Sequence, residues 1–112
     1  MFPKQFEILY VEKEERFNPH EAIKRVGGKD SYSMTWAATR DQVIGAIESG
    51  RYEFFVSSGN YYSIKARVIV AVNQFGHKYI KTEPDNTKQD NLLSLPSFPS
   101  VSTVTLNPFN SF

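Results

Sequence analysis

Apolar residues recur at helical spacing in residues 40–49, which form the clearest local pattern in the chain. The apolar stripe consists of Val43, Ile44, Ala46 and Ile47. Thr39 precedes the segment as a capping residue, Gln42 completes a capping box, and Gly50 follows as a stop signal. The pattern therefore predicts an amphipathic helix over residues 40–49, with its stripe facing a core.

After this helix the pattern changes from helical spacing to alternation. Residues 52–57 and 77–82 are short strand-forming runs, and residues 61–72 are a longer run with apolar side chains at every second position. A Gly-Asn pair between the first two runs is typical of a hairpin turn, and residues 73–76 turn the chain again. In this second hairpin we expect Ile80 to be buried and Lys81 to be exposed, with Val70 across from Lys78.

Other segments are less clear. Residues 6–11 (FEILYV) predict a first strand. Residues 19–26 carry helix-start signals but also suit a strand paired with residues 6–11, which is the interpretation we favour. The pair Gly27-Gly28 lacks the surroundings of a nucleotide-binding loop and is typical of a turn. Residues 101–106 alternate in polarity and can add a strand.

Together these elements predict an α+β fold, in which an antiparallel sheet of four or five strands has one main helix packed on one face. We expect residues 1–98 to form a single domain. Residues 99–112 are expected to form a C-terminal extension, either an added strand or a partner-binding tail. A chain of 112 residues can build one hydrophobic core without a metal or a disulfide.

Composition and charge limit the cellular compartment and the partners that we expect for the protein. The chain has no cysteine, which excludes disulfides and thiolate chemistry and suits the cytoplasm, where we expect the protein to act. Its start lacks the apolar stretch of a signal peptide, and no apolar run approaches the roughly 20 residues that span a bilayer. A formal net charge of +1 argues against nucleic-acid binding by bulk charge, although a local basic patch is compatible with it.

Three stretches are distinctive in combination. They are NPHEAIKRVGG at residues 18–28, TRDQVIGAIESG at residues 39–50, and GHKYIKTEPDNTKQDNLLSLP at residues 76–96. In this order and spacing they resemble a family of small bacterial or phage proteins of uncharacterised function. Its members end in a strand similar to KYLKT, an Asp-containing loop and an NLLSLP-type segment. The resemblance covers about residues 6–98 and implies a compact stand-alone domain, but it implies no activity and no catalytic residues.

Candidate residues for catalysis or metal binding are few. His20 and Glu21 form the only adjacent acid–base pair, and a small hydrolase would use them or Asp85. A turn or a helix start is the explanation of the pair that we favour, so we leave enzymatic activity open and lean towards none. The loop at residues 85–91 offers oxygen ligands, but its spacing does not match a calcium loop. We therefore predict no metal and no cofactor.

The predicted sheet has one face without a cover. If the Gly-Asn pair is a two-residue hairpin loop, Phe55 pairs with Ile64 on the helix side, and large apolar residues point to the opposite side. We predict that this opposite face and the tail form a protein-binding surface that includes a homodimer contact. Its residues are Tyr52, Phe54, Val56, Ile69, Val101, Val104 and Leu106.

An alternative use of the sheet is binding of single-stranded nucleic acid. Cations interleaved with aromatic rings on an open sheet can follow phosphates and stack bases. The candidate residues are Tyr61, Lys65, Arg67, Tyr79 and Lys81. A solvated outer face explains them as well, so we favour a non-catalytic protein-binding module of unknown biological role. Nucleic-acid binding and hydrolysis remain the alternatives.

Overall fold

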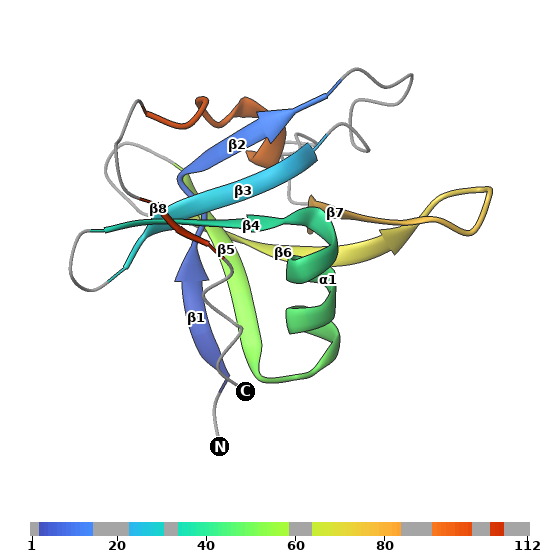
Figure 1. Ribbon diagram of the computed structural model, residues 1–112. Helices are drawn as coiled ribbons and strands as arrows, with labels where there is room; N and C mark the ends of the chain where they lie inside the picture. The colour runs from blue at the N-terminus through green and yellow to red at the C-terminus, as the bar shows by residue number, and fades with distance from the viewer. Residues whose placement is uncertain are drawn as a thin grey trace.

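Strands dominate the computed structural model, which describes residues 3–14, 23–30, 34–58, 64–83, 91–99 and 104–106 (Figure 1). The strands, with their bounds, are β1 (Lys4–Glu7), β2 (Tyr10–Lys13), β3 (Ile23–Lys29), β4 (Thr35–Thr39), β5 (Tyr52–Ser58), β6 (Ile64–Val72), β7 (Lys78–Thr82) and β8 (Val104–Leu106). The helix α1 (Arg40–Glu48) follows β4, and the 3-10 helix η2 (Asn91–Ser94) precedes β8.

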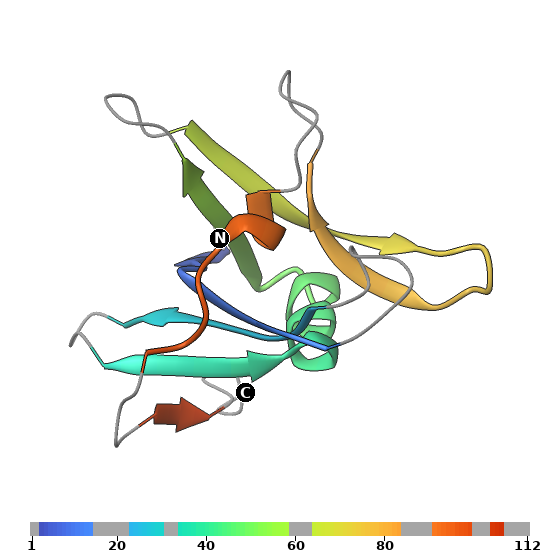
Figure 2. The ribbon, with the colours of Figure 1, turned by 90° about the horizontal axis from the view of Figure 1, so that it is seen from above.

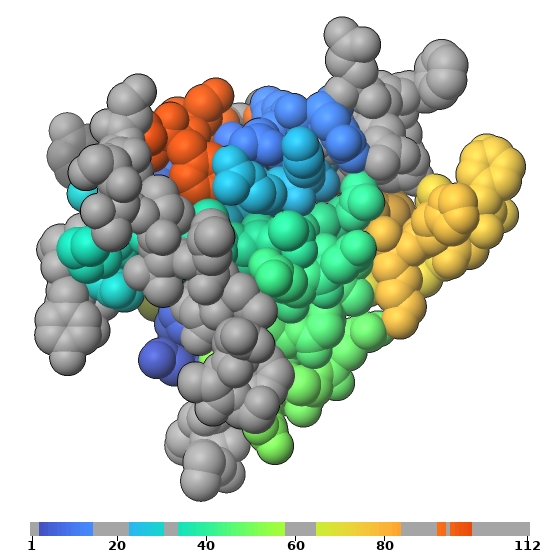
Figure 3. All heavy atoms as spheres, viewed as in Figure 1, coloured from blue at the N-terminus to red at the C-terminus, as the bar shows by residue number. Residues whose placement is uncertain are grey.

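The first sheet has the strand order β1-β5-β6-β7. β5 runs parallel to β1 and antiparallel to β6, and β6 and β7 form an antiparallel hairpin. The side-chain Oδ1 of Asn73 closes this hairpin, since it accepts hydrogen bonds from the N–H groups of Phe75 and His77 at 2.8 and 2.9 Å. Gly76 follows at φ 83°, a conformation that glycine adopts without steric cost. The hairpin stands out from the body as an arm (Figures 1 and 3).

The second sheet has the order β2-β3-β4-β8. β2, β3 and β4 are antiparallel neighbours, and β8 joins the edge of β4 in parallel. The chain crosses from the first sheet to the second at Ile8. The N–H of Ile8 donates to the carbonyl of Phe55 in the first sheet, and the N–H of Leu9 donates to the carbonyl of Gly27 in the second. The run at residues 6–11 is therefore divided between two strands in different sheets.

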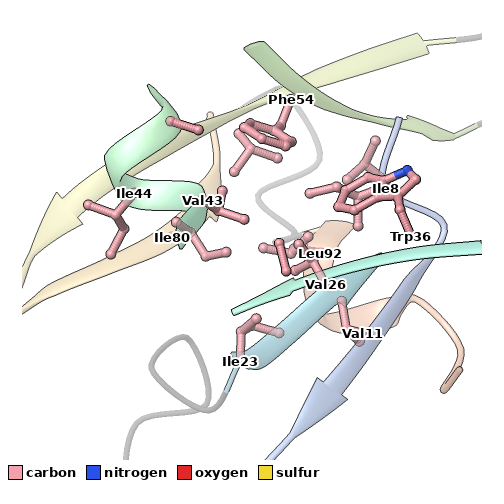
Figure 4. Close-up of a cluster of buried hydrophobic side chains, with 14 residues drawn as sticks. Ile8, Val11, Ile23, Val26, Trp36, Val43, Ile44, Phe54, Ile80 and Leu92 are labelled. Atoms are coloured by element: carbon pink, nitrogen blue, oxygen red, sulfur yellow. The ribbon is translucent and has the colours of Figure 1, made fainter. Parts of the chain in front are cut away.

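One core lies between the sheets and is closed by α1 and η2. Figure 4 shows Val26 and Leu92 meeting near its centre, with Trp36, Phe54 and Ile80 around them. These five side chains are at most 1% exposed. Because the core draws on both sheets and both helices, each element is stabilised mainly by contacts distant in sequence.

The predicted helix is confirmed, with the predicted cap. The Oγ1 of Thr39 accepts a hydrogen bond from the N–H of Gln42 at 3.2 Å, and the Gln42 side chain accepts one from the N–H of Thr39 at 2.8 Å. Val43, Ile44 and Ala46 are buried as the stripe requires, whereas Ile47 is half-buried against the core.

The predicted fold class is wrong. The structure is mostly β, with two four-stranded sheets and one short helix, instead of a single antiparallel sheet carrying a main helix on one face. Two features of the sequence hid the second sheet: β4 is a short run with two alanines, and β1 and β2 are continuous in the sequence. The strand interpretation is confirmed for residues 23–26, which pair with β2, while residues 15–22 lie outside the described part of the chain.

Gly27 and Gly28 do not form the predicted turn but lie inside β3. A Cβ atom on Gly28 would lie 2.3 Å from the carbonyl oxygen of Glu7, where the chain passes between the sheets. A Cβ on Gly27 would lie 2.4 Å from the carbonyl oxygen of Trp36 and would collide with the ring of Phe98. The glycine pair therefore serves close packing instead of chain reversal.

The segment that follows η2 wraps around the second sheet, and we call residues 95–99 the C-terminal strap. The N–H of Val11 donates to the carbonyl of Pro96 at 3.0 Å, which places the strap at the free edge of β2. The ring of Phe98 then lies on Gly27. The centroid of this ring is 5.9 Å from the centroid of the Tyr10 ring and 5.2 Å from the guanidinium of Arg25. Figure 2 shows this segment crossing over β2 and β3 on its way to β8.

Candidate functional site

The outer face of the first sheet brings polar, charged and aromatic side chains together. In the ladders, Phe55 lies opposite Arg67, Ile69 opposite Lys81, and Ala71 opposite Tyr79. The alternate residues of the same strands, among them Phe54, Val68 and Ile80, are buried in the core. α1, η2 and the second sheet all pack on that inner side, so no described helix or strand covers the outer face.

Contacts on this outer face hold its central side chains in place. The Nζ of Lys65 lies 4.7 Å from the centroid of the Phe55 ring, a cation–π contact. The Nη2 of Arg67 lies 3.8 Å from the Oε1 of Glu53, whose other oxygen accepts a hydrogen bond from the Gln5 side chain at 3.3 Å. A shallow hollow of about 150 Å³ opens among these residues and reaches down to Phe54. The face thus offers an aromatic ring flanked by charges of both signs.

Charges of the two signs occupy different strands of this face. Glu7 on β1 and Glu53 on β5 are acidic, whereas Lys65 and Arg67 on β6 and Lys81 on β7 are basic. Glu83, just beyond β7, is a third acidic residue and lies next to Arg67 in the sheet, since its N–H donates to the Arg67 carbonyl at 2.7 Å. Among the described residues, three cations and three anions balance on this face, which favours a partner carrying both signs over a polyanion.

For the predicted protein-binding surface, the sequence analysis placed the residues of β5 on the wrong side of the sheet. Phe54 and Val56 are 0% and 1% exposed and lie in the core, and Tyr52 is half-buried against it. The cause is the register. Phe55 pairs with Arg67 instead of Ile64, because residues 59–63 separate the paired ends Ser58 and Ile64. An odd shift in register moves every side chain of a strand to the opposite face.

The remaining members of the predicted protein surface are divided. Ile69 is half-buried on the outer face of the first sheet. Val104 and Leu106 belong to β8, where they pair with Thr35 and Ala37 of β4. Val101 lies outside the described residues. The structure therefore brings Ile69 near the charged face but places the tail at the second sheet.

Four of the five nucleic-acid candidates do lie together. Lys65, Arg67, Tyr79 and Lys81 share the outer face of β6 and β7, as predicted, while Tyr61 lies outside the described residues. The predicted register of the hairpin is off by two residues, since Val70 pairs with Ile80 instead of Lys78. An even shift preserves the faces, so Ile80 is buried as predicted, although Lys81 is half-buried instead of exposed.

The candidates for catalysis and metal binding are not described by the structure. His20, Glu21 and Asp85 all lie in parts of the chain that it does not describe. Among the described residues there is no group of three His, Asp or Glu side chains that could hold a metal ion. Within the same residues, no helix combines the length and apolar character needed to cross a membrane.

A second hollow, of about 380 Å³, lies between β2 and the C-terminal strap. Its wall includes Glu12, whose Oε2 accepts a hydrogen bond from the Nη2 of Arg25 at 2.5 Å, with the Nζ of Lys24 3.5 Å from the other oxygen. The hydrogen bond from Arg25, together with the two positive charges, lowers the pKa of the Glu12 carboxyl below its usual 4.5. Because Arg25 also lies against Phe98, this ion pair borders the strap.

Sequence reasoning missed two features of these surfaces. The first is the outward direction of Phe55, which the sequence pattern assigned to the helix side. Only the length of the connection between β5 and β6 could have indicated the correct side. The second is the contact of Phe98 with Gly27, which joins residues far apart in the chain. The only signal for it in the sequence is the presence of two glycines within a strand-forming run.

Comparison with known proteins identifies one family. Its model matches residues 7–96, and the family is described as a protein of unknown function, DUF3892. No curated protein and no solved structure matches the chain. An uncharacterised family covering most of the chain was expected from the three distinctive stretches.

Proposed function

The chain belongs to the DUF3892 family of unknown function, and from that premise we propose that it is a non-catalytic protein-binding module whose binding surface is the outer face of the first sheet. The observation that carries the proposal is the arrangement around Phe55. An aromatic ring lies beside a hollow, with Lys65, Arg67 and Glu53 fixed around it, on a face that no described helix or strand covers.

Energetics support a protein as the partner. Aromatic and arginine side chains contribute most of the binding energy in many protein interfaces, and Phe55 and Arg67 lie opposite each other here. Nearby charges of both signs set the orientation of a partner more than they add to its affinity. The face is thus suited to a protein surface with complementary charges.

A second candidate function is binding of single-stranded nucleic acid on the same face. The observation that favours it is the gathering of Lys65, Arg67, Tyr79 and Lys81 on two adjacent strands. The carboxylates of Glu7 and Glu53 on the neighbouring strands would repel phosphates. For this reason we place it second.

A photo-crosslinking amino acid at position 55 tests the proposal in the cell that makes the protein. We expect adducts with protein from position 55. The matched control is position 45 on α1, where Gly45 is exposed and has no neighbour within 4 Å of a side chain built there. Adducts that are sensitive to nuclease but resistant to protease would instead support nucleic-acid binding. A position 55 that yields no more adducts than position 45 would contradict both functions.

A further inference from the structure

The outer face of the first sheet divides into an acidic half and a basic half. Glu7 and Glu53 lie on β1 and β5, and Lys65, Arg67 and Lys81 lie on β6 and β7. The strand order β1-β5-β6-β7 makes these halves adjacent, with their boundary between β5 and β6. Glu83 is the exception, at the end of β7 beside Arg67.

We propose that the partner of this face is a second copy of the chain, packed face to face about a twofold axis near the β5–β6 boundary. The inference rests on the proposed function and names its partner. A twofold axis makes a surface its own partner, so that each contact occurs twice. An axis along the strands places β1 and β5 of one copy over β7 and β6 of the other, which brings Lys81 of one copy next to Glu7 and Glu53 of the other and Lys65 over Ser57.

Apolar groups lie where the two copies would meet. Phe55 is half-buried next to the boundary, and Ile69 and Ala71 continue along β6 on the same face. The hollow beside Phe55 is lined by both Glu53 and Lys65, so it can accept a side chain of either charge from the second copy. Two sheets packed face to face in this way bury the inward-pointing side chains between them.

The edges of the sheets are less suitable for pairing two copies. β7 is an edge strand of the first sheet, and two of its five residues are Lys78 and Lys81. Pairing two β7 strands would bring these cations together, and edge lysines are a common device against such pairing. In the second sheet, β8 of the same chain already occupies the edge of β4. The face is therefore the favoured contact.

Charge reversal with rescue tests the dimer on the full chain. One variant reverses the acidic half (Glu7→Lys with Glu53→Lys), and the other reverses the basic half (Lys65→Glu with Lys81→Glu). In sedimentation experiments we expect the wild type to be a dimer that weakens as salt increases, because the charges are exposed. Each variant alone should self-associate at least about tenfold more weakly, a change of 1.4 kcal/mol. An equimolar mixture should restore a species of twice the monomer mass.

Control variants separate a specific contact from a general effect of charge. Asp41→Lys on α1 and Lys29→Glu at the end of β3 reverse exposed charges away from this face and should leave the mass unchanged. Circular dichroism is the check that each variant is folded.

The inference is wrong if the wild type is a monomer at millimolar concentration, or if folded variants remain dimeric, or if the mixture fails to associate. Crosslinking at position 55 distinguishes these failures from a failure of the proposed function. Adducts with a different protein would overturn the second copy as the partner but leave the protein-binding surface intact. Adducts with no protein would overturn both.

Discussion

At the scale of single residues, close packing in the second sheet requires glycine at positions where a larger side chain would not fit. A Cβ atom at Gly27 would meet both the backbone carbonyl of Trp36 and the ring of Phe98. The same ring contacts Tyr10 and Arg25, so one small residue allows the C-terminal strap to lie flat on the second sheet. Glycine within a strand is unfavourable by itself, and here close packing compensates for it.

Gly27→Ala should therefore destabilise the protein by about 1–3 kcal/mol, because the new methyl group has no space between a backbone carbonyl and the ring. Gly45→Ala is the matched control. It adds the same methyl group at an exposed position inside α1 with nothing within 4 Å, and should stabilise by about 0.5–1 kcal/mol. Urea unfolding of both variants measures the difference, and equal effects would disprove the close packing at Gly27.

The ion pair of Glu12 predicts a dependence of stability on pH. The pKa of Glu12 is lowered in the folded state, so its contribution is complete above the unfolded value of about 4.5 and is lost as pH falls through the lower folded value. The carboxyl is partly exposed, which limits the contribution to about 1 kcal/mol or less. Glu12→Gln should therefore lower the free energy of unfolding more at pH 7 than at pH 3, because the contribution of the ion pair shrinks once pH falls below about 4.5. An equal loss at both pH values would show that charge is not involved.

At the scale of elements, local signals and long-range pairings differ in how well they can be predicted. The capping box of Thr39 and Gln42 lies within four residues, and both the helix and its cap were predicted correctly. The register of β5 on β6 depends instead on the connection between them, and an odd error there exchanged the inner and outer faces of β5. The basic residues of β6 and β7 were placed on the correct face because the error in that hairpin was even.

The conspicuous NLLSLP segment is explained by packing. Leu92, in η2, is fully buried in the core between the sheets, while Leu95 in the strap is half-buried against it. Leu92→Ala should cost about 2–5 kcal/mol, because it leaves a cavity that the surrounding strands cannot close. Leu95→Ala removes the same atoms from a site that water reaches, so we expect less than half of that cost. Thermal unfolding of the two variants tests the order, and the reverse order would mean that η2 is not part of the core.

At the scale of the whole molecule, no local pattern in the chain indicates that two sheets share one core. β1 and β2 are consecutive in the chain, yet they enter different sheets at Ile8, and β8 returns to pair with β4 from about seventy residues away. Parallel pairs of this kind bring together segments with no local relationship in the sequence. The fold class could not be predicted for that reason, although most of its individual strands could.

A metal is not expected to contribute to this core. Large apolar side chains from both sheets fill it, so folding needs no ligand cluster to hold the chain together. Dialysis against EDTA should leave the melting temperature unchanged. A fall of several degrees that calcium or zinc reverses would contradict this prediction and direct attention to Asp85 and its neighbours.

The chain's C-terminal part makes two separate contributions to the whole molecule, and truncation can distinguish them. A chain ending at Phe98 loses β8 but keeps the ring on Gly27, whereas a chain ending at Leu95 also loses that ring and the bond from Val11 to Pro96. We expect the first truncation to increase hydrogen exchange at the amides of β4 with a modest loss of stability. The second should also increase exchange along β2 and β3 and lower the melting temperature further, because Phe98 no longer covers them. Equal exchange patterns in the two truncated chains would show that the strap does not stabilise the second sheet.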